Sequence, residues 1–170
     1  MVRTASFACV LGIALGLALP LAAQTPKVRK TIAKDEAKYE RETKPVSRAK
    51  EVVKLGRAEY KAARQCVDAG NISGALQFLA NYNDQANAAH DALDKMGLDA
   101  EKHSNGFRQL QISTRESLRQ LRDIAGRVPF EQSQPFRALE KNLDALNQKL
   151  ILELFPRQPG HKIEDEKKKH

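Results

Sequence analysis

The sequence lacks tryptophan, and aromatic residues make up only 5% of its 170 positions. Alanine and leucine carry most of the apolar content, a composition that favours helices over sheets. No sustained alternation of polar and apolar residues occurs, so no strand is expected. The chain is therefore predicted to be all-α.

Cysteine is almost as scarce, with only Cys9 and Cys66 present. Cys9 lies inside an apolar run near the N-terminus, ahead of most of that run, which is not the position of a lipid-modified cysteine. If this segment is removed, Cys66 alone remains and no intramolecular disulfide can form. We interpret Cys66 as a small buried residue of a helix, the alternatives being an intermolecular disulfide or a reactive thiol.

The N-terminus has the order of a secretory signal peptide. Arg3 precedes an uncharged apolar run, residues 7–19, which Pro20 interrupts before the small residues of Leu21-Ala22-Ala23. The run is short and rich in alanine and glycine for a membrane-spanning helix. We expect cleavage before Gln24, export to the periplasm or the exterior, and no transmembrane segment afterwards. An uncleaved N-terminal anchor is the alternative.

Positive charge is concentrated in the segment that follows. Residues 24–64 contain thirteen Lys or Arg against six Asp or Glu, whereas residues 65–170 contain fifteen of each. Such an asymmetry can mark an anion-binding surface, although a solvated face is the more common origin. Residues 24–44 have few apolar positions and are predicted to form a basic arm, helical or extended.

Four amphipathic segments are predicted between residues 45 and 156. Pro45 begins the first and Gly70 ends it; Asn71 or Ser73 caps the second, which Gly97 ends; Pro129 ends the third, and Ser133 and Pro135 begin the fourth. Short links between them favour an antiparallel four-helix bundle. Each segment has an apolar seam, with these positions: Val46, Ala49, Val53, Gly56, Tyr60, Ala63 and Val67; Ile72, Ala75, Leu79, Tyr82, Ala86, Ala89, Leu93 and Met96; Phe107, Leu110, Thr114, Leu118, Leu121, Ala125 and Val128; Phe136, Leu139, Leu143, Leu146, Leu150 and Leu154.

These boundaries give four regions: a signal peptide (1–23), the basic arm (24–44), the helical bundle (45–156) and a disordered charged tail (157–170). Residues 63–79 also resemble the central turn of a tetratricopeptide repeat, through Gly70, Ala75 and Leu79. The resemblance covers one hairpin turn, and no second copy follows at the 34-residue period of that family. We interpret it as the general chemistry of a helical hairpin.

The third segment carries the best candidate binding residues, Arg108, Arg115, Arg119 and Arg122. Their spacing of seven and four places them on one side of a helix, where guanidinium groups could grip phosphates or carboxylates. The alternative is a solvated face whose charges pair with Glu116, Asp123 and acids of neighbouring helices.

Metal ligands are few. His90 and Asp94 stand four residues apart on the second segment and could share one face, but bundle metal sites draw inward ligands from several helices. We treat this pair as a weak candidate and predict no cofactor. No Gly-rich phosphate loop or nucleophile elbow occurs.

Together these observations predict a non-catalytic, extracytoplasmic helical protein that acts as a binding or interaction module. Its partner is expected to be an unknown protein or an anionic envelope component, and nucleic acid is not expected. Two alternatives remain: a binder of an anionic envelope component through the arginines, and a periplasmic metal-binding or small enzymatic bundle.

Overall fold

The computed structural model describes residues 26–156, and within them every regular element is helical. The order is α1 (Pro26–Arg41), α2 (Pro45–Asp68), α3 (Ile72–Asp94), α4 (Phe107–Ala125), a short 3-10 helix η2 (Phe130–Gln132) and α5 (Gln134–Leu154). The prediction of an all-α chain is thus confirmed for this region. The predicted signal peptide, residues 1–23, and the predicted tail, residues 157–170, lie outside it.

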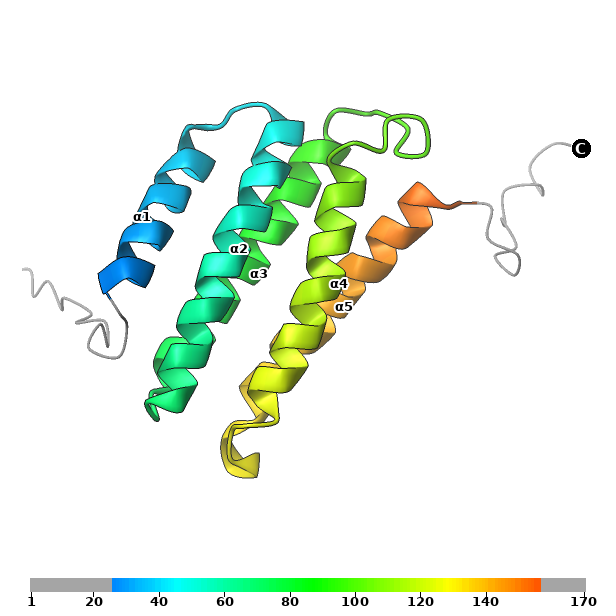
Figure 1. The fold of residues 1–170 in the computed structure, drawn as a ribbon. Helices are drawn as coiled ribbons and strands as arrows, with labels where there is room; N and C mark the ends of the chain where they lie inside the picture. Colours follow the sequence, from blue (N-terminus) through cyan, green and yellow to red (C-terminus); the bar gives the residue numbers. More distant parts are fainter. Residues whose placement is uncertain (1–25, 157–170) are drawn as a thin grey trace, which may run out of the picture.

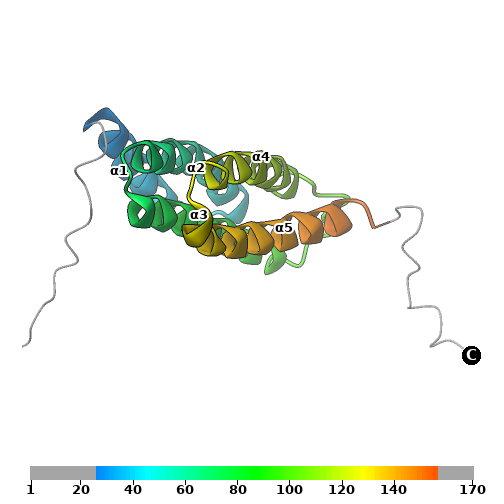
Figure 2. The same ribbon diagram turned by 90° about the horizontal axis from the view of Figure 1, so that it is seen from below.

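The helices lie in two layers (Figures 1 and 2). One layer contains α1, α2 and α4, and the other contains α3 and α5. Sequential helices run in opposite directions, whereas α2 and α4, which pack side by side, run in the same direction. Helix α1 packs along α2, so α2 is covered by α1, α3 and α4.

The turn between α2 and α3 follows the predicted chemistry. Gly70 adopts a φ of 74°, a left-handed conformation that suits glycine, and the Asn71 amide donates to the carbonyl of Cys66 at 2.7 Å. The Asn71 side chain then accepts from the Gly74 amide at 3.0 Å. Asn71 is therefore the cap of α3, as predicted.

Helix α2 begins at Pro45, as predicted, without a capping side chain. Lys44 occupies the N-cap position, with extended backbone and no capping hydrogen bond from its side chain, and Pro45 follows in the first turn. Because proline has the φ of a helix and lacks the N–H that a cap would satisfy, the helix can begin here without a capping side chain.

The buried surface of α2 is wider than a single seam. Val46, Val53 and Val67 of the predicted seam are only partly buried, whereas Val52, Leu55, Ala58, Ala62 and Cys66 are buried outside it. A heptad seam describes a helix with one partner. Since α2 contacts three helices, burial spreads around most of its circumference.

Gly56 of α2 lies directly against the Tyr82 ring of α3. A Cβ added at Gly56 would overlap the Tyr82 ring, and that ring packs edge-on against Tyr60 with centroids 5.3 Å apart. The Tyr82 hydroxyl and the Ser113 hydroxyl of α4 are hydrogen bonded at 3.1 Å. The small residue predicted to admit a neighbouring helix therefore admits an aromatic ring that joins three helices.

The apolar seams of α4 and α5 complete the core that α2 and α3 begin. All predicted seam positions of these helices are buried except Ala125 and Leu139, which are partly buried. No helix among residues 26–156 combines the length and the apolar character needed to cross a membrane.

Candidate functional site

The predicted arginine row lies on the outside of α4. Arg108, Arg115, Arg119 and Arg122 are all exposed. Arg122 Nε donates to Glu140 Oε1 of α5 at 2.6 Å, and this hydrogen bond and charge raise the pKa of Arg122. Glu140 therefore offsets the charge of one of the four arginines.

Arg119 has a different environment. It lines a shallow hollow of about 420 Å³ together with Arg64, Gln120 and two acids, Glu116 and Asp123. Two cations and two carboxylates leave this hollow without net charge. Arg119 is the one member of the predicted row that lines this hollow. The hollow therefore does not bring the four arginines together around one anion.

The weak metal candidates, His90 and Asp94, have separate partners. His90 is buried, with Nε2 at 3.0 Å from both carboxylate oxygens of Glu153 on α5, and with Nδ1 at 3.5 Å from Asp91. Asp94 lies 4.0 Å from Lys149. Within residues 26–156, no group of three His, Cys, Asp or Glu side chains is arranged to hold a metal ion. Sequence reasoning missed Glu153, which is 63 residues from His90.

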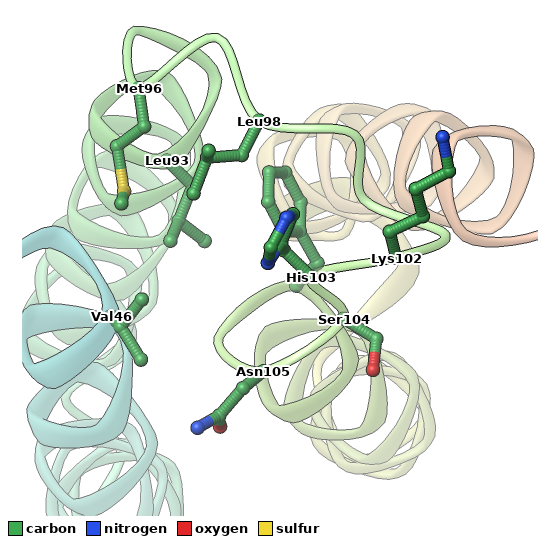
Figure 3. Close-up of a pocket in the computed structure, with 9 residues that line it drawn as sticks. Val46, Leu93, Met96, Leu98, Lys102, His103, Ser104 and Asn105 are labelled. Atoms are coloured by element: carbon green, nitrogen blue, oxygen red, sulfur yellow. The ribbon is translucent and has the colours of Figure 1, made fainter.

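A pocket of about 360 Å³ opens at the end of the bundle where α3 is linked to α4 (Figure 3). We call it the loop pocket. Figure 3 shows Met96, Leu93 and Val46 along one side of it, facing Leu98 and His103 on the other. Its lining comes from α2, α3, the 95–106 link and the start of α4: Val46, Leu93, Met96, Leu98, Lys102, His103, Ser104, Asn105 and Phe107.

Two glycines shape the link that forms this pocket. Gly97, with a φ of 62°, turns the chain away at the end of α3. Gly106, with a φ of 92°, sits where an added Cβ would lie 3.0 Å from Leu93 and 3.5 Å from the Val46 backbone. The link can therefore approach α2 and α3 closely just before Phe107 begins α4.

Two apolar side chains that line the loop pocket are exposed. Met96 and Leu98 have exposed fractions of 39% and 41%. The sequence predicted Met96 as the last buried position of the α3 seam, and this expectation is wrong. α3 ends at Asp94, so Met96 falls in the link instead of facing the core.

The rim of the pocket is polar. Lys102 lies 3.5 Å from Asp99, whose side chain also accepts from the Glu101 amide at 2.9 Å. Slight desolvation acts to raise the pKa of Asp99, but the hydrogen bonds from Glu101 and Lys102 outweigh it, and the pKa is lowered. Binding pockets are commonly lined by apolar side chains together with a few polar groups.

A second unusual group lies away from the pocket. Glu59 of α2 is only 2% exposed, and its Oε2 has no hydrogen-bond partner among residues 26–156. Burial, with a smaller contribution from the charge of Glu36 on α1, raises the pKa of Glu59 to about 8. Sequence reasoning missed this residue, because an isolated glutamate in a charged helix resembles an exposed one.

Comparisons of the chain with models of protein families, with curated proteins and with solved structures find no match. The case for a function therefore depends on the geometry described above.

Proposed function

We propose that this protein is a non-catalytic, exported helical module that binds a partner protein through the loop pocket. The observation that carries the proposal is the pair of exposed apolar side chains, Met96 and Leu98, at the mouth of a concave apolar site. An apolar group entering this pocket would remove apolar surface from water on both sides, which is favourable by about 25 cal/mol per Å².

The partner we propose is a protein that inserts one bulky apolar side chain. Its contact would have an apolar centre formed by Met96 and Leu98 and a polar rim that includes Lys102. Protein interfaces commonly combine a desolvated apolar centre with a polar rim. Most of the lining side chains are apolar, which supports a binding role for the pocket over a catalytic one.

The rest of the proposal concerns architecture and location. We propose that α2 to α5 act as an antiparallel four-helix bundle and that α1 acts as a basic arm held against it. The order of Arg3, the apolar run and Ala23 supports export with cleavage before Gln24. N-terminal sequencing of protein recovered outside the cytoplasm should begin within a residue or two of Gln24, whereas an intact Met1 would contradict cleavage.

A second candidate function is binding of an anionic envelope component by the α4 arginines. The observation in its favour is that Arg108 and Arg115 are exposed on the same side of α4. Arg115→Lys keeps the charge but loses the planar fork, so binding of inorganic phosphate or of a phosphorylated polymer should weaken if these arginines form a site. Unchanged binding would leave a solvated face as the better interpretation. The alternative of a metal or enzymatic site at His90 has less support, since Glu153 engages its Nε2.

The main proposal is tested by selecting displayed random peptides against the folded chain. The selected peptides should share a bulky apolar residue, and Leu98→Asp should weaken their binding at least tenfold. Leu152→Asp is the matched control, because Leu152 of α5 has a similar exposed fraction of 44% but lies outside the loop pocket. Peptides that bind both variants equally, or no selected peptide at all, would contradict the proposal.

A further inference from the structure

Phe130, in the 3-10 helix η2, is the most exposed large apolar residue within residues 26–156, with an exposed fraction of 72%. The next residue, Glu131, is also exposed. Aromatic side chains carry a large apolar area and are common among the residues that dominate protein interfaces. Phe130 is therefore a candidate for burial in a partner.

Hydrogen bonds hold the turn that carries Phe130. The Phe130 carbonyl accepts from Ser133 twice, from Oγ at 2.7 Å and from the amide at 3.1 Å, and Ser133 itself is buried. The Arg137 guanidinium lies 5.5 Å from the centre of the Phe130 ring. These contacts restrict the turn before any partner arrives, which lowers the entropy that binding would cost.

Phe130 and the loop pocket lie at opposite ends of the bundle (Figure 1). The 95–106 link that helps to form the pocket precedes α4, and η2 follows it. The 19 residues of α4 separate the two by about 28 Å, at the helical rise of 1.5 Å per residue. Phe130 cannot reach the pocket of its own chain, so a second copy is needed to bring them together.

The charges beside the two features are complementary. Lys102 and His103 line the loop pocket, whereas no Asp or Glu of the described residues does. Lys102 lies 3.5 Å from Asp99, but its side chain is 76% exposed and an ammonium has three donors, so it can also bind a carboxylate of a partner. Glu131 supplies such a carboxylate next to the aromatic ring.

We infer that the protein associates head to tail, with Phe130 of one copy in the loop pocket of the next and Glu131 beside Lys102. The inference rests on the function proposed above and names the partner as a second copy of this chain. The ring would lie against the apolar wall that Figure 3 shows, formed by Val46, Leu93 and Met96. Contacts between two different surfaces of one chain can continue beyond a dimer.

Phe155 is a second exposed phenylalanine, with an exposed fraction of 56%. It follows α5, which ends at the same end of the bundle as the loop pocket (Figure 1). A contact through Phe155 would join two like ends of the bundle, and Pro156 follows it in place of an acid. Phe130 therefore fits the pocket of a second copy better than Phe155 does.

The contact should be weak. One aromatic side chain buries about 150–250 Å², whereas stable protein interfaces bury about 1,200–2,000 Å² in total. Association is therefore expected at high protein concentration, and it should be reversible on dilution.

Sedimentation equilibrium of the purified protein, from micromolar to millimolar concentration, tests the inference. The average mass should rise past that of a dimer. Phe130→Asp and Leu98→Asp should each raise the association Kd at least tenfold, and Glu131→Lys should raise it because it sets a second lysine beside Lys102. Phe155→Asp is the matched control and should leave the Kd unchanged. A wild-type protein that stays monomeric, that stops at a dimer, or that associates equally well as Phe130→Asp would overturn the inference.

Mixing the variants tests the direction of the contact. The Phe130→Asp chain keeps its pocket and the Leu98→Asp chain keeps its Phe130, so an equimolar mixture should form a dimer and nothing larger. Met96→Asp takes the place of Leu98→Asp if that variant does not fold. A mixture that stays monomeric where wild type associates would overturn the inference. Selected peptides that bind the loop pocket of a protein that stays monomeric would overturn it too, while leaving the proposed function standing.

Discussion

Helix α2 has two very different neighbours, α3 and α1. Against α3 it offers a glycine that admits the Tyr82 ring, whose hydroxyl is hydrogen bonded to Ser113. Against α1 it offers a cation–π contact, in which the Arg48 guanidinium lies 4.4 Å from the centre of the Tyr39 ring. Only Val28 and Tyr39 of α1 are buried apolar residues.

Buried polar atoms without hydrogen-bond partners occur on both sides of α2 among residues 26–156, and those in the C-terminal half of α2 and in α3 are Arg64 Nε, Gln65 Oε1, Asn83 Oδ1 and Gln85 Oε1. Arg29 Nε of α1 and Arg48 Nε, Glu51 Oε2 and Glu59 Oε2 of α2 are buried without hydrogen-bond partners among residues 26–156. Each such atom costs about 1–3 kcal/mol of desolvation. The comparison teaches that α2 and α3 form a close-packed pair, while α1 is held by a thin contact and should be the first of these helices to loosen.

The largest effect is expected from Leu79→Ala in α3. Leu79 is 2% exposed in the core, so its truncation should lower the free energy of unfolding by about 2–5 kcal/mol. Val28→Ala in α1 is the companion change and should cost less, because α1 can loosen locally without unfolding the rest. Urea denaturation of both variants measures the difference, and equal losses would argue against the comparison.

Gly56→Ala should have the next largest effect on stability. The new methyl group would overlap the Tyr82 ring, and overpacking of this kind costs about 1–3 kcal/mol. Gly126→Ala is the matched control, because its methyl group would meet only Arg122 and Asp123 carbonyl oxygens at 3.4 and 3.7 Å. Thermal unfolding should show a lower Tm for the first variant alone. A tolerated Gly56→Ala would mean that α2 and α3 are not packed as closely as described.

The third prediction concerns the pH dependence that Glu59 introduces. Its pKa is about 8 in the folded chain against 4.5 for an unperturbed glutamate, so between these values the folded state holds a proton that the unfolded state has released. The contribution of Glu59 to stability is therefore complete below pH 4.5. It falls by about 1.4 kcal/mol per pH unit as the pH rises towards 8.

Glu59→Gln should remove this slope, because an amide does not titrate. Glu131→Gln, at an exposed position of η2, should leave it in place. Denaturation midpoints of the three proteins measured from pH 5 to pH 9 give the comparison directly. Parallel curves for wild type and Glu59→Gln would show that the Glu59 carboxyl group is not held in its protonated form.

Much of the fold follows from local signals in the sequence. Gly70 and Asn71 end one helix and begin the next, and the leucines of α5 repeat on one face, so these elements could be predicted without tertiary information. The extra burial of α2 could not, because a heptad pattern does not reveal how many neighbours a helix has. The candidate sites were harder still, since Glu153 of α5 meets His90 of α3 only after the two helices pack.

The central claim is that α1 is the loosely held helix, and hydrogen exchange of backbone amides tests it most directly. Amides in the middle of α1 should exchange through local opening, at a lower free energy than those in the middle of α2 and α3. At pH 8, Glu59→Gln should increase the protection of the α1 amides, and it should raise the protection of the α3 amides only by the gain in the free energy of global unfolding. If the α1 amides are protected as strongly as those of α2 and α3, opening only when the whole chain unfolds, the account is contradicted.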